Sequence, residues 1–443
     1  MMGELRVGIS RRNITPPVGA SMAGYAARDH GAEGVRDELW LRALFLDDGD
    51  AQAVLMCRDV CDTQRGEMDL LEGMFEQRMG LKPEQLFIAN THTHSGPSTS
   101  YEQESDNRDY VENLAAVCVG AAEEARANAR PVVMTRAQRP VQCGVNRRER
   151  TAEGQIVLGV NPEGPCDTTV DVLVFAEPET AEPVATLFRH GVHGVVMGSD
   201  NYLISGDAPG AAERFVEANL PGAAGFLAGA SGNINAHPRG SFENVDMLGR
   251  RLGGAVVQAT TEAEQPRTDV RIVSLRHELE LPVEEPAPED ELREEIEELE
   301  AAMERLDAGE DVQGLTRWRT DRRLRHARSQ LEMLEAGEEI GGKPTFVQVL
   351  AIGDVALVGY PAEVFYEIGR EVRERSPFAL TLDVTHVNGW SGYIPIASAF
   401  DEGGYEIQAR VHHCGLGITP EAEAVLITES LRGLARARRA IGD

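Results

Sequence analysis

Two histidines two residues apart, His92 and His94, lie in a polar segment that directly follows an apolar run at residues 86–89. In an extended backbone residues i and i+2 face the same side, so both imidazoles are expected to point into one space. Followed by the turn residues 95–97, this arrangement suits a metal ligand beside a proton carrier. A pair of packed core or surface histidines is the alternative interpretation.

A second pair, His190 and His193, ends another apolar run at residues 184–188. Four of the eleven histidines therefore lie at the ends of two predicted strands, a concentration that a purely structural role does not readily explain. Of this pair, His190 is expected to support the site and not to be a ligand. Further along, Asp207 precedes Ala208 and Pro209 and is predicted to be the N-cap of a helix.

The elements that must position these side chains alternate along the chain. Short apolar or β-branched runs predict buried strands at 54–56, 86–89, 170–175, 184–188, 225–228 and 355–358, and helical patterns occupy 68–79, 111–127 and 211–218. Strands that alternate with helices indicate an α/β fold with a mixed sheet. In such folds functional sites collect on loops at strand ends.

Residues 284–339 differ from the rest because charged residues dominate there. Apolar residues recur at alternating spacings of four and three, as in a coiled-coil seam, on both sides of a glycine-containing break at 309–314: Leu292, Ile296, Leu299, Met303, Leu306, Leu324, Ala327, Leu331 and Leu334. Gly337 is placed where a helix C-cap is expected. We predict an inserted helical hairpin, either a solvated excursion, a contact for a homo-oligomer or a wall over the active site.

Composition narrows the classes of partner. The formal net charge of -30 argues against nucleic acid, whose phosphates need clustered Lys and Arg, and against an anionic membrane surface. No signal-like segment begins the sequence and no run approaches the roughly 20 apolar residues of a membrane span, so a cytoplasmic protein without membrane insertion is expected. In that compartment the six cysteines are expected to be free thiols: Cys57, Cys61, Cys118, Cys143, Cys166 and Cys414. A metal site at Cys57 and Cys61 is the less favoured alternative.

Several motifs together resemble the neutral/alkaline, non-lysosomal ceramidase family. The segments 7–17 and 22–25 look like its N-terminal signature, residues 91–97 match its Thr-His-Thr-His-Ser-Gly-Pro motif, and 190–207 are similar to its second histidine stretch. The resemblance covers about residues 5–260 and 345–415. It implies an α/β, mixed-sheet, ceramidase-like catalytic domain built from 1–280 and 345–443, with the hairpin at 284–339 inserted.

The resemblance also implies a catalytic Zn²⁺ held by His92, His193, Glu363 and Tyr393. Tyr405 lies in a nearby glycine-rich loop and is an alternative to Tyr393. From the sequence alone, Glu363 could equally be a carboxylate at a helix start, since it closely follows Pro361.

Further site residues follow from the same resemblance. Arg147 is expected to grip the carbonyl or carboxylate side of a substrate, with Arg148, Arg150 and a plain ion-pair role as alternatives. Asn235 stands where the family carries an active-site serine, so acyl transfer to a serine is not expected there.

The implied activity is hydrolysis of an amide bond in an N-acyl-type small molecule more soluble than ceramide. Zinc would supply a hydroxide nucleophile, His94 would shuttle a proton, and Tyr393 would be a weak ligand or an oxyanion donor, aided by backbone N–H groups of residues 229–235. A zinc-dependent esterase, lactonase or hydrolase of a carbohydrate-linked bond is one alternative. A non-catalytic zinc-containing scaffold is the other.

Overall fold

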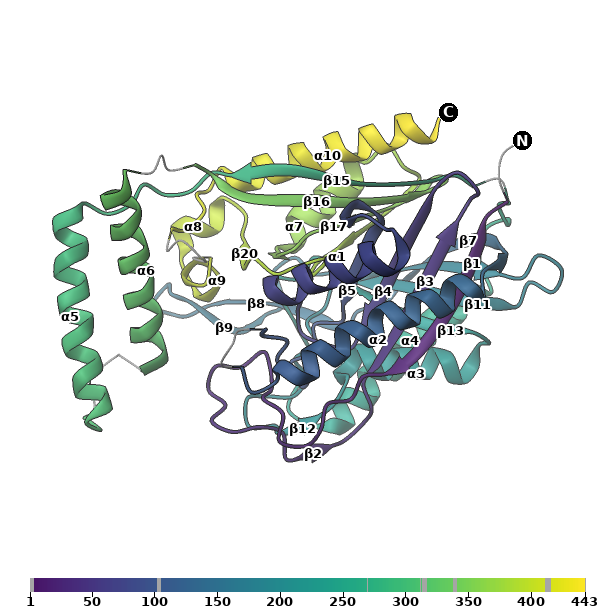
Figure 1. Ribbon diagram of the computed structural model, residues 1–443. Helices are drawn as coiled ribbons and strands as arrows, with labels where there is room; N and C mark the ends of the chain where they lie inside the picture. Colours follow the sequence, from purple (N-terminus) through teal and green to yellow (C-terminus); the bar gives the residue numbers. More distant parts are fainter. Residues whose placement is uncertain are drawn as a thin grey trace.

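The computed structural model describes residues 4–101, 105–268, 270–310, 312, 317–337, 341–410 and 416–442 of the 443-residue chain, without the side chains of 318 and 319. Three larger β-sheets form its body, and each has a pair of helices on its outer face (Figure 1).

The first sheet has the order β5-β4-β3-β1-β6. Its strands are β1 (Arg6–Asn13), β3 (Trp40–Asp47), β4 (Gln52–Arg58), β5 (Leu86–Asn90) and β6 (Arg130–Pro131). Side chains alternate along β4: Val54 and Met56 pack with helices α1 (Arg65–Met79) and α2 (Arg108–Ala127), whereas Leu55 and Cys57 face the centre of the molecule. β4 and β5 are parallel, so their carboxyl ends lie at one edge.

The second sheet has the order β13-β11-β10-β7. Its strands are β7 (Val133–Pro140), β10 (Thr169–Ala176), β11 (Pro183–His190) and β13 (Ala223–Ala228). Helices α3 (Asp207–Asn219) and α4 (Phe242–Thr260) cover its outer face through Val216, Leu248 and Val256. As in the first sheet, two neighbouring strands are parallel, here β11 and β13.

The third sheet has the order β15-β16-β17-β19. Its strands are β15 (Ile272–Leu281), β16 (Lys343–Ile352), β17 (Val355–Gly359) and β19 (Leu380–Val384), the last two parallel. Helices α7 (Tyr366–Arg375) and α10 (Ala422–Ile441) pack on its outer face.

The inner faces of the three sheets share one hydrophobic cluster. Leu55 and Phe87 from the first sheet pack there with Leu187 from the second and with Leu357 and Leu382 from the third. Burying each such side chain contributes roughly 1.5–3 kcal/mol. The shared core therefore fixes the three sheets against one another, and with them the strand ends that carry the candidate residues.

Smaller elements lie at these strand ends. β14 (Ile234–Ala236), β8 (Gly144–Arg150) and β9 (Ile156–Asn161) form a three-stranded sheet, and β18 (Glu363–Val364) pairs with β20 (Tyr393–Ile394). β2 (Gly34–Val35) pairs with β12 (Leu203–Ile204). The remaining short helices are η1 (Pro83–Gln85), α8 (Ser398–Glu402) and α9 (Tyr405–Gln408).

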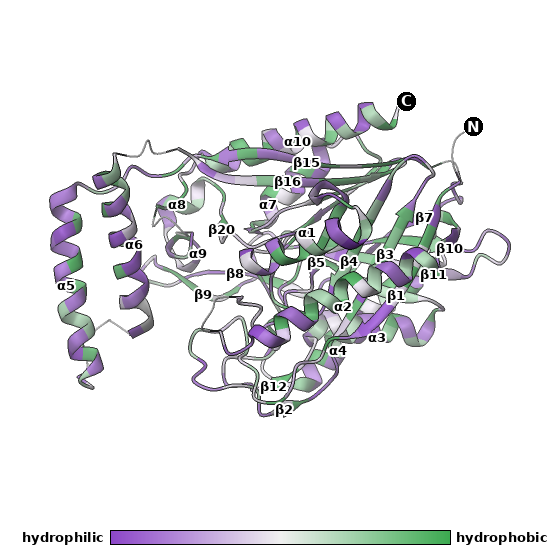
Figure 2. Ribbon diagram, in the orientation of Figure 1, coloured by the Kyte–Doolittle hydropathy of each residue, from purple (hydrophilic) through white to green (hydrophobic). Residues whose placement is uncertain are grey.

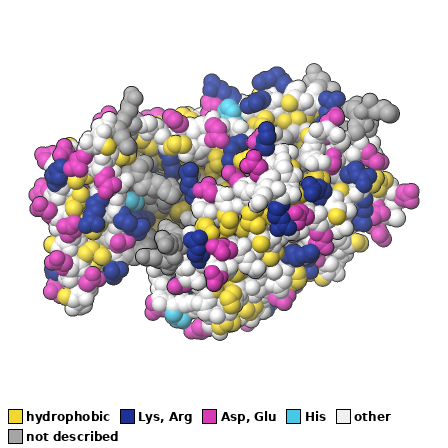
Figure 3. Space-filling view, viewed as in Figure 1, with side chains coloured by type: hydrophobic (Ala, Val, Ile, Leu, Met, Phe, Trp, Pro, Cys, Tyr) yellow, Lys and Arg dark blue, Asp and Glu magenta, His cyan; other side chains and the backbone are white. Residues whose placement is uncertain are grey.

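The charged segment forms two helices, α5 (Glu289–Asp307) and α6 (Arg317–Ala336), that pack against each other beside the body (Figure 1). Leu292, Leu299, Leu324 and Ala327 of the predicted seam are buried. Hydrophilic residues dominate the pair in Figure 2, and acidic and basic side chains alternate over its surface in Figure 3. Gly337 follows α6 with a φ of 62°, as expected of a C-cap glycine.

The predicted strands and helices all lie within observed elements, and the mixed α/β prediction is confirmed. The N-cap prediction is wrong by one residue, because Gly206 precedes α3 and Asp207 is its first residue. The carboxylate of Asp207 instead accepts amides of Val196 and Met197 as well as its neighbour Ala208.

Five cysteines are free thiols, and Cys414 lies outside the described residues. The first three residues of the chain, where the sequence shows no signal-like segment, also lie outside them. Within the described ranges, no helix is both long enough and apolar enough to cross a membrane.

Candidate metal centre

Three segments far apart in sequence bring His92, His193 and Glu363 together. His92 follows β5, His193 follows β11, and Glu363 begins β18. His193 Nε2 lies 3.0 Å from Glu363 Oε2, and His92 Nε2 lies 3.7 Å from the same oxygen. All three side chains are buried. Glu363 precedes α7 and faces the histidines, so its alternative interpretation as a helix-start carboxylate is wrong.

The second ring nitrogen of each histidine is already engaged. His92 Nδ1 lies 2.8 Å from the carbonyl oxygen of Cys61. His193 Nδ1 lies 2.8 Å from the Ser231 carbonyl and 3.0 Å from that of Ile234. Because a carbonyl only accepts, each Nδ1 carries the proton and each Nε2 presents a lone pair. Outer partners of this kind are typical of metal-binding histidines.

The convergence of acceptors fits a cation. Neutral His193 directs a lone pair at a carboxylate oxygen 3.0 Å away, and the His92 lone pair points to the same oxygen. Such groups repel one another unless a cation lies between them. Ligands about 2.1 Å from a tetrahedral Zn²⁺ are roughly 3.4 Å apart, a distance between the two observed spacings. This group could therefore hold a metal ion.

Electrostatics favour the ligand forms. Burial acts to raise the pKa of Glu363, but contact with the ring of His193, followed by that of His92, holds this pKa well below its ordinary value, so the carboxylate is ionised. Burial, followed by the charge of Arg147, lowers the pKa of His193 to about 4. Trp390 Nε1 donates to the other oxygen of Glu363 at 3.1 Å, which fixes the carboxylate.

Tyr393 and Tyr405 both lie near this group, and they differ in burial. Tyr393 is buried, and it pairs in register with Glu363 between β20 and β18. Tyr405 is 46% exposed, with its ring edge-on to Tyr393 at a centroid distance of 5.7 Å. Burial, followed by the Glu363 charge, raises the pKa of Tyr393 well above its ordinary value. The surrounding side chains thus keep the phenol protonated and able to donate.

Arg147 lies between an ion pair and the candidate centre. Its Nε donates to Glu406 at 2.8 Å, and its Nη1 lies 3.3 Å from Asn235 Oδ1 and 3.5 Å from His193 Nε2. Its Nη2 is buried and has no hydrogen-bond partner among the described residues. Arg148 binds the other Glu406 oxygen at 2.7 Å and so supports this loop.

His94 contacts the other histidine of the group, with its Nε2 3.1 Å from His92 Nε2. The ring of Tyr25 contacts His94 edge-on at 5.0 Å. A Cβ added at Gly24, whose φ is 91°, would fall 2.4 Å from His94 Cγ, so only glycine leaves room for this ring. Burial and the neighbouring His92 lower the pKa of His94 well below its ordinary value, which keeps it neutral.

Sequence reasoning missed His386. This buried residue stacks on His92 at a centroid distance of 3.7 Å and an angle of 13°, with a backbone φ of 58°. A usable signal was present, because His386 follows the strand β19 just as His92 and His193 follow β5 and β11. The alternative prediction of a metal site at Cys57 and Cys61 is wrong for Cys57, which packs in the core.

Cys61 does form a second candidate group with His92 and His94. Burial raises the pKa of its thiol well above the ordinary value, which disfavours the thiolate that binds metals.

Four backbone amides of the 229–235 loop, the predicted contributor to an oxyanion site, already have acceptors. The amides of Gly229, Ala230, Gly232 and Ile234 already donate to His190 O, Asp383 Oδ2, Val364 O and Ser231 O respectively. These four N–H groups hold the loop in place and are not available to a substrate oxygen.

Comparison with known proteins identifies the family and agrees with the observed fold. The family model for the N-terminal part of neutral/alkaline non-lysosomal ceramidases matches residues 5–236. The neutral ceramidase from Pseudomonas aeruginosa superposes with a TM-score of 0.68 at 17% identity, over 98% of this chain and 75% of that one. A ceramidase complexed with C2 gives 0.69 at 16% identity, over 98% and 76%. With its match over more than half of the sequence, the chain belongs to the neutral/alkaline non-lysosomal ceramidase family.

Proposed function

We propose that this protein is a zinc-dependent hydrolase that cleaves the amide bond of an N-acyl-type small molecule with water as the nucleophile. The observation that carries the proposal is the set of three buried acceptors, on His92, His193 and Glu363, beside polar groups with unused hydrogen-bonding capacity. A closed structural zinc site would instead use four protein ligands, commonly thiolates. Names of the similar structures, both ceramidases, support an amide as the scissile bond.

The donor set favours zinc among common metals. Imidazole nitrogens with one carboxylate oxygen, at spacings close to tetrahedral, suit Zn²⁺ better than Mg²⁺ or Ca²⁺, which prefer oxygen ligands. When bound, zinc supplies Lewis acidity that polarises a carbonyl and lowers the pKa of water from 15.7 to about 7.

Tyr393 and Arg147 are proposed to bind the substrate carbonyl. The protonated phenol of Tyr393 donates to the oxygen as negative charge develops on it, and the free Nη2 of Arg147 donates from the same side. Glu406 and Asn235 hold the guanidinium in place. One donor of this kind contributes roughly 10²- to 10³-fold to turnover. In this scheme Tyr393 is a hydrogen-bond donor, and its role as a fourth ligand is the alternative.

His94 is proposed to move the proton. Its lowered pKa keeps the imidazole neutral, so it can take a proton from the attacking water and pass it to the leaving nitrogen. Its Nδ1 is buried without a hydrogen-bond partner among the described residues, and its Nε2 is directed at His92. Asn235 has no nucleophilic group, which is consistent with direct attack by water.

The substrate is proposed to be a small soluble molecule met in the cytoplasm. The strongly acidic chain, with a formal net charge of -30, supports a partner that is neither nucleic acid nor an anionic bilayer.

The test pairs metal content with a substrate panel. Purified protein is analysed for metal by mass spectrometry and assayed on matched N-acyl amides, esters and lactones, before and after chelation and with zinc restored. We expect one zinc per chain and amide hydrolysis that chelation abolishes. Hydrolysis of esters or lactones alone would overturn the amide assignment, and zinc without turnover on any member would favour a scaffold.

A matched pair of variants tests the proposed donor. Tyr393→Phe should lower kcat by roughly 10²-fold while zinc content stays near one per chain. Tyr405→Phe removes a hydroxyl from the exposed neighbouring ring and should change kcat less than about threefold. Loss of zinc in Tyr393→Phe would instead identify Tyr393 as a ligand.

A further inference from the structure

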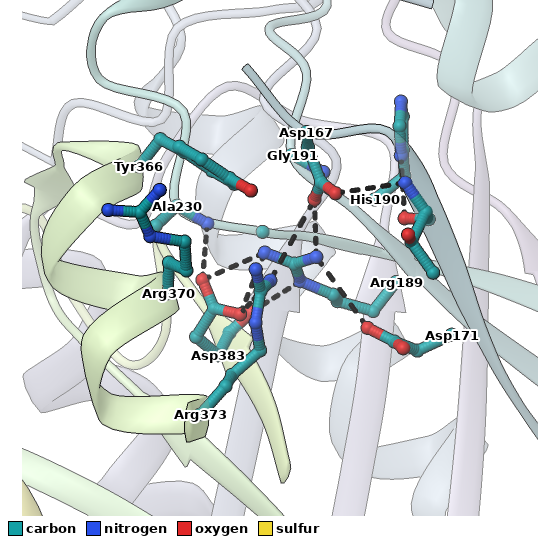
Figure 4. A network of polar contacts seen from close by, with 12 residues as sticks. Asp167, Asp171, Arg189, His190, Gly191, Ala230, Tyr366, Arg370, Arg373 and Asp383 are labelled. Atoms are coloured by element: carbon teal, nitrogen blue, oxygen red, sulfur yellow. Dashed lines mark hydrogen bonds and ion pairs between the residues drawn. The ribbon is translucent and has the colours of Figure 1, made fainter. Parts of the chain in front are cut away.

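A buried cluster of charged groups centred on Arg189 lies next to Gly191, two residues before His193 in the chain (Figure 4). The Arg189 guanidinium is fully buried and bonds to Asp167, to Asp383 at 2.7 Å and to Asp171 at 3.6 Å. Arg373, from α7, adds a second cation 2.8 Å from Asp383. Buried charges are costly unless they are paired. Here each of the two guanidinium groups has a carboxylate partner.

Two carboxylates of the cluster also bind the backbone of the loops that reach the metal centre. Asp167 Oδ2 accepts the amide of Gly191 at 2.9 Å, and Asp383 Oδ2 accepts that of Ala230 at 2.9 Å. The fit is close, since a Cβ added at Gly229 would lie 2.5 Å from Arg189 Nε. The guanidinium thus connects two loops that are distant in sequence (Figure 4).

Both loops lead directly to His193. Gly191 is two residues before it in the chain. Ala230 precedes Ser231, whose carbonyl accepts the Nδ1 proton of His193. A shift of either loop would separate the ring from this carbonyl, and the proton could then move to Nε2, the nitrogen directed at Glu363. The cluster and the ligand are therefore joined by a short chain of hydrogen bonds and covalent bonds.

We propose that Arg189, Asp167 and Asp383 are positioning residues of the metal centre, which fix the place and tautomer of His193 through the amides of Gly191 and Ala230. The inference rests on the proposed metal site and not on any particular substrate. Asp383 also adjoins the second ligand, because the chain continues through Thr385, which donates to Ala228 O, to His386 stacked on His92. Outer partners of metal ligands commonly change metal affinity 10- to 100-fold.

The experiment measures metal affinity, independently of turnover, in Asp383→Asn and Asp171→Asn. Asp171 offers a matched control because its carboxylate is buried against the same guanidinium, yet its other partner is Gln138. Zinc dissociation constants are obtained by competition with a chromogenic chelator, and the visible spectrum of the Co²⁺-substituted protein reports ligand geometry. We expect Asp383→Asn to weaken zinc binding 10- to 100-fold and alter the Co²⁺ spectrum, while Asp171→Asn changes affinity less than threefold with the native spectrum.

A milder variant covers the case in which Asp383→Asn does not fold. Arg373 is 18% exposed and contacts Asp383 from the rim of the cluster, so Arg373→Gln loosens the carboxylate without leaving Arg189 unpaired. It should weaken zinc binding roughly threefold. Native affinity and spectrum in Asp383→Asn or, failing that, in Arg373→Gln would overturn the proposal, as would equal losses in Asp171→Asn. Zinc binding without hydrolysis would count against the proposed function alone.

Discussion

His193 donates its Nδ1 proton toward two carbonyl oxygens, whereas His92 has one such acceptor and rests its ring flat on His386. The backbone differs as well, because His92 has a φ of 58°, in the left-handed region that is costly for residues other than glycine. The ring of His193 thus has two carbonyl acceptors, whereas that of His92 has one, together with a stacked ring and a constrained backbone.

A fully buried arginine also lies near each of these candidate ligands. Arg58 holds the loop that carries the Cys61 carbonyl, through Asn90 at 3.0 Å and through Thr63 and Glu67. Arg189 does the same for the loops around His193. The loops beside both candidate ligands thus contain a similar buried charged cluster, while the direct contacts of the two rings differ.

The largest effect should come from removing a ligand ring. His92→Ala and His193→Ala should each weaken zinc binding more than about 100-fold, beyond what loss of an outer partner produces. Zinc content after dialysis, measured by mass spectrometry, checks this. His190→Ala is the control, since His190 is buried nearby with its Nδ1 3.0 Å from Thr169 O. Full zinc in His193→Ala would remove that residue from the ligand set.

Breaking the cluster on the His92 side should mainly reduce stability. Glu67→Gln leaves Arg58 buried without its anion and should lower the free energy of unfolding by about 3–5 kcal/mol. Urea denaturation measures the change. Glu123→Gln breaks a pair with Arg78 that is partly exposed and should cost less than about 1 kcal/mol. Equal losses of unfolding free energy in the two variants would mean that burial does not make the Arg58–Glu67 pair more important for stability.

On the His193 side, Asp207 should make stability depend on pH. Burial raises its pKa to about 6, despite the amides of Ala208, Met197 and Val196 that act in the opposite direction. The native state therefore binds this proton more tightly than the unfolded chain, whose carboxyl has a pKa of about 3.9. Its contribution is fully present below about pH 4 and is lost as pH rises to about 6, by about 3 kcal/mol.

The difference between native and Asp207→Asn unfolding free energies, followed from pH 4 to 7, isolates that contribution. The unfolding free energy of the native protein minus that of Asp207→Asn should decrease from pH 4 to about pH 6 and then stay constant. A difference independent of pH would show that Asp207 remains ionised throughout.

The smallest effect should come from the stacked ring on His92. His386→Phe retains a flat ring and should leave zinc affinity within about twofold. His386→Ala removes it and should weaken binding by about 3- to 10-fold, roughly 1 kcal/mol. Competition with a chelator measures both. If the two variants behave alike, stacking does not hold His92.

The pattern of elements was predictable because each sheet buries its inner face and packs helices outside, and these requirements leave strong local periodicity in residues such as Val54 to Cys57. The ends of two predicted strands also indicated His92 and His193 as candidate site residues. Their meeting with Glu363 depends on three sheets sharing one core, which no local pattern records.

His386 escaped prediction for a similar reason. Its role depends on a ring contact between residues nearly 300 positions apart and on a left-handed backbone at a residue other than glycine. The expectation that amides of the 229–235 loop aid an oxyanion site could not include the acceptors Asp383 and Val364, which bind two of these amides from a distant part of the chain.

The helices α5 and α6 connect β15 to β16, antiparallel neighbours whose facing ends, Leu281 and Lys343, are paired in register. The two attachment points are thus already as close as the ends of an ordinary hairpin turn. In evolutionary terms, such a connection can be lengthened, shortened or exchanged in one event without moving any ligand residue. Comparison of relatives should therefore show chain length varying at this point while the residues around His92, His193 and Glu363 keep their spacing.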